Sequence, residues 1–406
     1  MNHRSGAFRT PPALSLLLAT LLVASCGGAD DSGTPVSGAP APAPSPQACT
    51  ATSFMGKSSV LIGGSMTDAS ANTAPFDARY LYLAGGIRKA GQCASSCDGS
   101  CGQWWGCWQD TSQPPGQYAQ GFMNASAGAT WQGSARPQIP VFTYYELLQS
   151  GGIAEGNGEV VGVNDPELLK RYLDDWRFLL QKIGSKQAML HLEPDFWAYA
   201  RNVNSNPHAI PAQVTAANST DCASQENSVA GLARCMIGMT RKYAPNAKVG
   251  LHASPWLWGN SGDGLVTGKF MAALGADAGD FVVSDLSDRD AGFYQYHENN
   301  PNRWYTPTDS ANFLLWSKAV TQTVGKPMVL WQIPLGNMAQ NNTSDHWQDT
   351  HVDYLLGHMG DVADAKVAAL LFGAGAGLQT TVESDGGNLI SKTIANAKAG
   401  GTPMCK

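Results

Sequence analysis

The chain has 406 residues, of which 43% are hydrophobic and 14% charged, and its formal net charge is −6 at pH 7. The balance is mildly acidic and no basic cluster appears, so nucleic acid is not an expected partner. Length alone allows one large domain or two.

The first 25 residues predict a secretory signal peptide. His3, Arg4 and Arg9 precede an apolar run that ends in small residues and is too short to span a bilayer comfortably. The segment LVASC, which ends at Cys26, resembles a bacterial lipobox, in which the cysteine is lipidated and becomes the mature N-terminus. The alternative is ordinary secretion, with Cys26 left in the cleaved peptide.

Residues 26–47 predict a lipidated cysteine followed by a tether rich in proline, alanine and glycine. No aspartate follows Cys26 directly, so the inner-membrane retention signal is absent. We therefore expect an exported protein, either a lipoprotein of the bacterial cell surface or outer membrane or a secreted one. Apart from the lipid anchor no membrane contact is expected, and residues 48–406 would form a single catalytic domain.

The eight cysteines after Cys26 predict disulfides, because the number is even and the chain is exported. We expect four, among them Cys222–Cys235, which closes a short loop, and Cys49–Cys405, which joins the ends of the body. The spacing C-x3-C-x3-C-x5-C at 93–107 could instead bind zinc. It lacks the usual C-x2-C pairs and a nearby histidine, so disulfides are favoured.

Short apolar runs that end in small or polar residues recur along the body and predict strands at 59–66, 79–86, 139–148, 188–197, 248–256, 281–288, 327–336 and 367–377. Helical patterns lie between most of them, at 164–184, 228–244, 265–276, 309–325 and 346–359. Eight buried strands alternating with helices predict an α/β fold, the (β/α)8 TIM barrel, with a disulfide-rich insertion (87–138) after strand two. A doubly wound sheet gives the same alternation, but no Gly-x-Gly-x-x-Gly opens the first helix.

Carboxylates follow several of the predicted strands, where barrel enzymes place their catalytic groups. Glu193 and Asp195 end the fourth strand, and Asp285 ends the sixth. Residues two apart on a strand point to the same side, so Glu193 and Asp195 could both face the barrel mouth. Adjacent acids raise one another's proton affinity and leave a proton donor beside an anion, the pair that glycoside hydrolysis needs.

Further polar and aromatic residues near the strand ends are candidates for substrate binding: Asp68, Glu146, Trp197, His252, Trp256, Trp331 and Gln332. Indole rings can stack on the apolar faces of sugar rings, and Glu146 could bind a sugar hydroxyl. Each also has a structural interpretation, since tryptophans belong to cores and His252 could be a hydrogen-bonding wall residue.

The segment LEPDFW (192–197) resembles the Ile-Glu-Pro-Asp segment of the cellulases in glycoside hydrolase family six. The aspartate is the proton donor there, which implies that Asp195 is the general acid. The segment DLSDRD (285–290) resembles that family's Asp-Leu-Pro-x-Arg-Asp motif, although the motif comes before the Glu-Pro-Asp segment in the family and after it here. The broader resemblance is to barrel glycosidases, whose commonest clan carries a nucleophilic glutamate on strand seven. Gln332 stands nearest that place and its amide cannot attack, so inversion is expected.

The expected function is that of a monomeric, surface-tethered barrel glycosidase that acts on a polysaccharide without a cofactor or metal. The alternatives are a non-catalytic glycan-binding surface lipoprotein and a polysaccharide lyase or deacetylase-type enzyme. A serine esterase and a zincin peptidase are disfavoured, because the sequence has neither Gly-x-Ser-x-Gly nor His-Glu-x-x-His.

Overall fold

The computed structural model describes residues 52–86, 92–108, 112–255, 263–337, 348–375 and 379–404. Residues 49–406 form one compact unit. The expected signal peptide and tether lie outside the described residues, as do Cys26, Cys49, Cys405 and Trp256. No helix among the described residues is long and apolar enough to cross a membrane.

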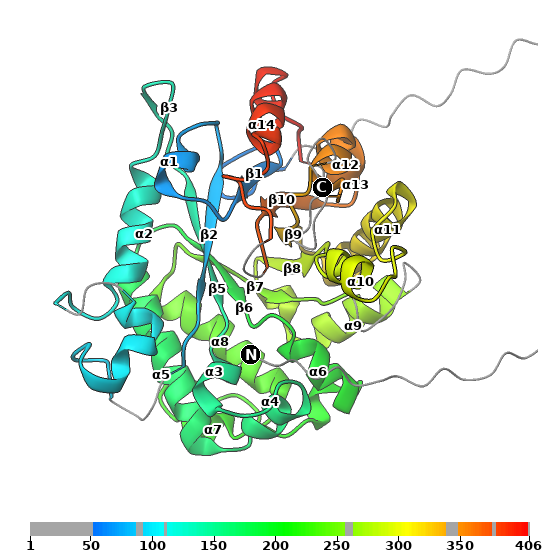
Figure 1. The fold of residues 1–406 in the computed structure, drawn as a ribbon. Coiled ribbons are helices and arrows are strands. Elements are labelled where there is room, and N and C mark those ends of the chain that lie inside the picture. Colours follow the sequence, from blue (N-terminus) through cyan, green and yellow to red (C-terminus); the bar gives the residue numbers. More distant parts are fainter. Residues whose placement is uncertain are drawn as a thin grey trace, which may run out of the picture. The chain divides into compact units, whose positions relative to one another are not determined.

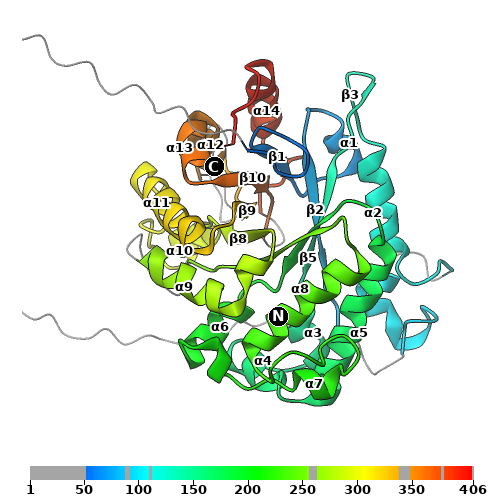
Figure 2. The same ribbon diagram turned by 180° about the vertical axis from the view of Figure 1, so that it is seen from behind.

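Eight parallel strands close into a barrel in the order β1-β10-β9-β8-β7-β6-β5-β2, which confirms the predicted (β/α)8 architecture. Figures 1 and 2 show the strands at the centre of the fold and the helices around them. Most strand residues are buried, which explains why these strands are apolar runs rather than alternating patterns. The strands are β1 Leu61–Gly64, β2 Ala78–Leu83, β5 Ile139–Tyr144, β6 Met189–Leu192, β7 Lys248–His252, β8 Phe281–Asp285, β9 Met328–Ile333 and β10 Val367–Phe372.

The helices connect the strands, and their ends follow local capping chemistry. In the helix predicted at 164–184, the Asp165 carboxylate accepts hydrogen bonds from the Glu167 and Leu168 N–H groups, and Gly184 ends the helix. The helices are α1 Asp68–Ala71, α2 Gln117–Ala127, α3 Leu147–Gly151, α4 Asn157–Gly162, α5 Pro166–Ile183, α6 Phe196–Val203, α7 Val214–Ala217, α8 Val229–Tyr243, α9 Gly264–Leu274, α10 Ala291–His297, α11 Pro307–Val324, α12 His351–Gly357, α13 Met359–Asp364 and α14 Asn388–Lys398.

Two regions differ from the sequence-based expectation. The helix expected at 346–359 is shorter in its described part, where α12 covers 351–357, and a second short helix, α13, follows His358 and extends beyond the expected range. The insertion at 87–138 shows no clear helical period in its sequence, yet it contains the helix α2. The apolar residues that α2 buries are Ala119 and Met123. It also carries the antiparallel hairpin of β3 (Thr130–Trp131) and β4 (Ser134–Ala135).

The insertion is held by disulfides, as expected, and not by zinc. Its four cysteines pair as Cys93–Cys101 and Cys97–Cys107. The expected Cys49–Cys405 bond lies outside the described residues. Nearby, the Thr52 N–H donates to the Met404 carbonyl at 3.2 Å, so the two ends of the described body lie side by side.

The insertion is also fastened to the barrel by one buried carboxylate on α5. The indole N–H groups of Trp104 and Trp105 each donate to Asp175 at 2.9 Å, and the Tyr144 hydroxyl donates to it at 2.7 Å. These three bonds connect the insertion, α5 and β5. Asp175 therefore adds a buried polar connection to the packing of both indole rings against Phe178 of α5.

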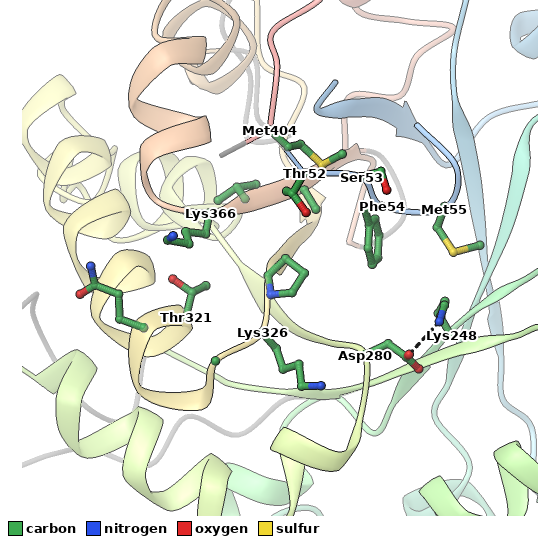
Figure 3. Close-up of a pocket in the computed structure, with 15 residues that line it drawn as sticks. Thr52, Ser53, Phe54, Met55, Lys248, Asp280, Thr321, Lys326, Lys366 and Met404 are labelled. Atoms are coloured by element: carbon green, nitrogen blue, oxygen red, sulfur yellow. Dashed lines mark hydrogen bonds and ion pairs between the residues drawn. The ribbon is translucent and has the colours of Figure 1, made fainter. Parts of the chain in front are cut away.

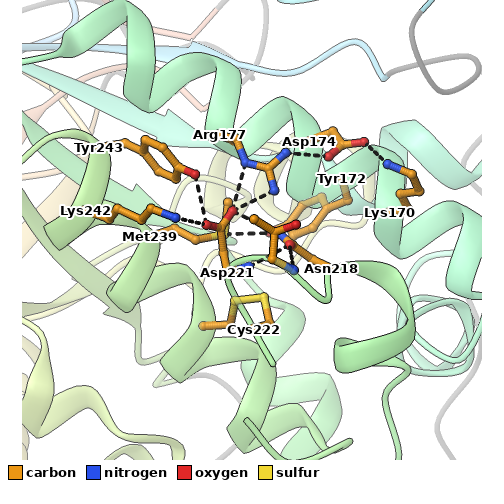
Figure 4. A network of polar contacts seen from close by, with 12 residues as sticks. Lys170, Tyr172, Asp174, Arg177, Asn218, Asp221, Cys222, Met239, Lys242 and Tyr243 are labelled. Atoms are coloured by element: carbon orange, nitrogen blue, oxygen red, sulfur yellow. Dashed lines mark hydrogen bonds and ion pairs between the residues drawn. A yellow bond between two sulfur atoms is a disulfide. The ribbon is translucent and has the colours of Figure 1, made fainter. Parts of the chain in front are cut away.

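The predicted disulfide Cys222–Cys235 is confirmed. Next to it, Asp221 accepts hydrogen bonds from Arg177 on α5 and from Lys242 and Tyr243 near the end of α8 (Figure 4). These contacts lower the pKa of Asp221 against the effect of burial, which acts to raise it. The loop closed by the disulfide is thus bound to both α5 and α8.

Candidate active site

The carboxyl ends of two barrel strands carry unusual backbone conformations. Glu193 (φ 46°) and Asp195 (φ 71°) follow β6, and Gln332 (φ 51°) lies near the end of β9. A positive φ is strained for non-glycine residues, and such strain is concentrated at functional sites. Both places coincide with candidate residues from the sequence.

Of the two acids that follow β6, Asp195 is half-buried and Glu193 is fully buried. No hydrogen bond to its carboxylate occurs within the described part of the chain. Burial raises its pKa and Asp285 raises it further, while His252 and Arg289 act in the opposite direction. An acid with a raised pKa and unoccupied oxygens is suited to donate a proton.

Asp285 ends β8 and is held on both sides. Its Oδ1 lies 3.3 Å from His252 Nε2, and its Oδ2 lies 3.4 Å from Arg289 Nη2. Asp285 therefore lies between an imidazole and a guanidinium that can both donate to it, whereas Asp195 has no such donor among the described residues.

Glu193 is oriented differently from the sequence-based expectation that it would face the barrel mouth beside Asp195. It is fully buried, and its Oε1 accepts the N–H groups of Glu146 and Leu147, both at 3.1 Å, where α3 begins. Burial, with a further contribution from Glu159, raises its pKa to about 8. Glu193 is therefore uncharged at neutral pH and anchors α3.

Glu146 is also fully buried, and its Oε2 accepts the Gly86 N–H at 2.8 Å. Burial raises its pKa strongly, and Asp175 adds to this. The hydrogen bond to Gly86 connects the start of α3 to the segment that follows β2.

Gln332 and Trp331 stand close together on β9. The Gln332 amide donates to the Tyr82 hydroxyl, and Tyr82 packs edge-on against the Trp331 ring at 5.4 Å. Trp331 is 2% exposed and also packs against His191 and His252, with ring centroids 4.7 and 5.9 Å away. In this conformation Trp331 supports the barrel interior rather than offering a face to a sugar ring.

Two other candidates make no contact with Asp195 or Asp285 among the described residues. Trp197 is fully buried and donates its indole N–H to the Leu192 carbonyl at 3.0 Å. Asp68 is on the surface, and its ion-pair partner is Arg79, at 2.7 Å. Within the described residues, no contact joins either side chain to Asp195 or Asp285. Trp256 is not described.

The other acids of the DLSDRD segment have structural contacts. Asp288 accepts a hydrogen bond from the Tyr305 N–H at 2.7 Å and lies 2.8 Å from His351 Nε2. Asp290 is the N-cap residue of α10. Of the three aspartates, only Asp285 contacts His252 and Arg289, so it is the one placed at the site.

Sequence reasoning did not single out Tyr82, His191, Arg289 or Glu159. His191 could have been found, since it lies two residues before Glu193 and therefore on the same face of the predicted strand. Tyr82 could also have been found, since it lies one residue before the end of β2, near the end of a predicted strand. Glu159 lies on α4, far from any predicted strand end, and burial raises its pKa to about 7. No sequence pattern marked it.

A cavity of about 580 Å³ lies at the opposite end of the barrel, beside the amino ends of β7, β9 and β10 (Figure 3). Lys248, Lys326 and Lys366 line it together with Phe54 and other residues. Asp280, the carboxylate among its lining residues, lies 3.1 Å from Lys248. This cavity offers no pair of carboxylates, so the candidate active site remains at the carboxyl ends of the strands.

The fold and site define the class of protein: a (β/α)8 barrel with a half-buried acid at the end of β6 and an ion-paired carboxylate at the end of β8. No group of three or more histidine, cysteine, aspartate or glutamate side chains within the described ranges could hold a metal ion. A comparison with protein-family models found no match, and neither did one with curated proteins.

Solved structures similar to this chain include several polysaccharide-degrading enzymes. The endo-1,4-β-mannanase from Rhizomucor miehei is 13% identical over 87% of this chain and 99% of its own, with a TM-score of 0.46. A Cellulomonas fimi mannanase of glycoside hydrolase family 26 is 12% identical over 84% and 70%, also at 0.46. The endoglucanase Cel6 from Mycobacterium tuberculosis is 15% identical over 66% of this chain and 64% of its own, at 0.31. Likeness at this level does not assign a function, which has to be argued from the site.

Proposed function

We propose that this protein is a glycoside hydrolase that cleaves a polysaccharide, with Asp195 as the general acid and Asp285 as the general base. The observation that carries the proposal is the contrast between the two carboxyls. Asp195 is half-buried with a raised pKa and no hydrogen-bond partner within the described residues, whereas the two oxygens of Asp285 contact nitrogen donors of His252 and Arg289. One protonated and one ionised carboxyl is the requirement of glycoside hydrolysis.

The proposed stereochemistry is inversion. Asp195 follows β6 and Asp285 ends β8, so one strand, β7, separates them. Neighbouring strands are about 4.8 Å apart, and two steps leave room for a water molecule between the carboxyls, as inversion requires at about 6.5–9.5 Å. Gln332, near the end of the seventh barrel strand, is an amide that donates to Tyr82 and cannot act as the nucleophile of a retaining enzyme.

The proposal includes export and attachment. Three disulfides in the described residues are compatible with an oxidising compartment. Lipidation at Cys26 and the tether at 26–47 would place a monomeric barrel at the cell surface, where it can reach an external polysaccharide. The chain's own carboxylates carry the proposed chemistry, so no cofactor is required.

The test is substitution of each acid on a substrate found by screening polysaccharides for reducing-end release. Asp195→Asn and Asp285→Asn should each lower kcat about a hundredfold or more, because each removes a proton-transfer group, while the substrate still binds. The control is Asp174→Asn, which removes a surface carboxylate paired with Lys170 and Arg177 on α5. NMR of the first product should show the inverted anomer.

Near-wild-type turnover of both Asp195→Asn and Asp285→Asn would overturn the proposed site. Binding without any cleavage by the unsubstituted protein would favour the glycan-binding alternative. An unsaturated product, detected by its ultraviolet absorbance, would indicate a lyase, and released acetate would indicate a deacetylase. A retained anomer would overturn inversion alone.

A further inference from the structure

Four side chains form a chain of close contacts across four adjacent barrel strands. Thr143 Oγ1 on β5 lies 3.2 Å from His191 Nδ1 on β6. His191 Nε2 lies 2.9 Å from His252 Nδ1 on β7, and His252 Nε2 lies 3.3 Å from Asp285 Oδ1 on β8. The strands are neighbours in the order β5-β6-β7-β8, so the contacts run along the barrel wall to one of the two proposed catalytic groups.

This chain of contacts is isolated from solvent. Thr143 is fully buried, His191 is 1% exposed and His252 is 2% exposed. The two imidazole rings stack with centroids 5.0 Å apart, and the Trp331 ring packs edge-on against both. Burial, together with the neighbouring His252, lowers the pKa of His191 well below its usual value, so His191 is neutral.

The contacts have one consistent direction when Asp285 is ionised and both imidazoles are neutral. A carboxylate only accepts hydrogen bonds, so His252 must donate from Nε2. A neutral imidazole then has an accepting Nδ1, which requires His191 to donate from its own Nε2. His191 Nδ1 is left as an acceptor, and the Thr143 hydroxyl is the donor that lies beside it.

We propose that Thr143, His191 and His252 are positioning residues that form a directional hydrogen-bond relay ending at Asp285. The Thr143 hydroxyl, one residue short of the end of β5 and two imidazoles away from Asp285, supplies the donor to His191 Nδ1 and so stabilises the Nε2-protonated tautomer of both histidines. This tautomer presents an N–H to Asp285. It thereby stabilises the ionised carboxylate and fixes the direction of its Oδ1.

The role in catalysis rests on the proposed function, in which Asp285 is the base. A base must be ionised and aimed before the substrate arrives, and a buried N–H donor supplies both conditions. The opposite tautomer would turn the lone pair of His252 Nε2 towards the carboxylate. The two would then repel each other, and Asp285 would be displaced or would take up a proton.

The first test is spectroscopic and needs no substrate. In nitrogen-15-labelled protein at neutral pH, the imidazole proton–nitrogen correlations should show His191 and His252 both neutral and protonated on Nε2. Assignment uses His191→Gln and His252→Gln variants. A ring protonated on Nδ1, or a doubly protonated ring, would overturn the relay.

The second test compares two substitutions of Thr143. Thr143→Val keeps the shape and removes the hydroxyl, whereas Thr143→Ser keeps the hydroxyl and removes the methyl group. The valine variant leaves His191 Nδ1 without its donor, so the Nε2-protonated tautomers should be less populated than in wild type, and kcat should fall about tenfold with KM unchanged, the size of effect expected for one lost hydrogen bond. The serine variant should keep the wild-type tautomers and most of kcat.

A packing role for Thr143 predicts the reverse order, with valine tolerated and serine impaired, and that result would overturn the proposal. Thermal denaturation of both variants checks that each is folded. The two proposals fail separately. Wild-type tautomers with an active Asp285→Asn enzyme would refute the proposed function and leave the hydrogen-bond relay intact. Histidine tautomers other than those expected, together with an inactive Asp285→Asn enzyme, would refute the hydrogen-bond relay and leave the proposed function intact.

Discussion

Glu193 and Asp195 are two residues apart, and the period of a β-strand predicts that they point the same way. The strand ends at Leu192, however, and both acids have a positive φ, so the alternation of a strand no longer applies to them. Glu193 turns into the protein and accepts two backbone N–H groups of the α3 turn, and Asp195 remains half-buried. Neighbouring acids in the sequence thus acquire an anchoring and a proposed catalytic role.

This difference can be tested at Glu193. Because its pKa is raised from 4.5 to about 8, the folded state binds more protons than the unfolded state between these pH values, and stability falls as pH rises through them. Glu193→Gln mimics the protonated acid and removes this dependence. We expect the free energy of unfolding of Glu193→Gln, relative to wild type, to increase steadily from pH 5 to pH 8, as measured by urea denaturation.

Glu193→Ala is the matched comparison. It leaves the Glu146 and Leu147 N–H groups buried without their acceptor, and should lower the free energy of unfolding by about 3 kcal/mol at neutral pH. Equal stability of the alanine and glutamine variants would contradict the anchoring role.

At the scale of elements, the disulfide-rich insertion depends on α5 for its position. Two disulfides close it internally, but Asp175 connects it to the barrel through the indoles of Trp104 and Trp105. All three groups that contact the carboxylate are donors, since the third is the Tyr144 hydroxyl. Apolar packing acts at the same place, because both indole rings also lie against Phe178 of α5, with ring centroids 5.3 and 5.8 Å away.

Asp175→Asn should be strongly destabilising for this reason. The amide replaces one accepting oxygen by an NH₂ group that faces donors, so at least one buried donor loses its partner. We expect a loss of about 3 kcal/mol in the free energy of unfolding, measured by guanidinium denaturation followed by tryptophan fluorescence. Asp174→Asn, one residue earlier and on the surface of α5, should cost about 1 kcal/mol or less. Equal effects of the two substitutions would show that Asp175 does not hold the insertion.

At the scale of the whole molecule, the barrel is closed, and the first and last described segments of the chain are hydrogen-bonded to each other. The Thr52 N–H donates to Met404, and the Met404 N–H donates to the Ser58 carbonyl at 2.9 Å. The tether expected at 26–47 therefore joins a body whose terminal segments are already bonded to each other. Cys26 is not among the proposed catalytic or binding residues, so removal of a lipid anchor there should change location and not activity.

Cys26→Ser tests this expectation. In cells, the variant should leave the membrane fraction. The kcat and KM of the barrel should stay within about twofold of wild type, because substitutions away from functional features usually have small effects. Fractionation and labelling with a fatty-acid analogue measure the outcome. Unchanged membrane association, or absence of lipid label on the unsubstituted protein, would contradict the lipoprotein expectation.

The barrel was predictable from the sequence because its cause is local. Each strand is a short apolar run buried on both faces, and each long helix has its own periodicity and caps, so alternation can be recognised without knowing any contact. The preference for disulfides over zinc at 93–107 also followed from spacing and compartment. The position of Asp195 shortly after β6 and of Asp285 at the end of β8 was predictable for the same reason.

The tertiary structure alone decided how these pieces meet. The pairing Cys93–Cys101 and Cys97–Cys107, the burial of Trp331, and the order Thr143, His191, His252 and Asp285 depend on strand register and on backbone turns between distant segments. Register is set by how the whole barrel packs, which no local pattern contains. The sequence by itself therefore determined the architecture and the end of the barrel that carries the acids. Packing across neighbouring strands decided that Glu193 accepts the backbone N–H groups of α3 and that Asp285 contacts His252 and Arg289.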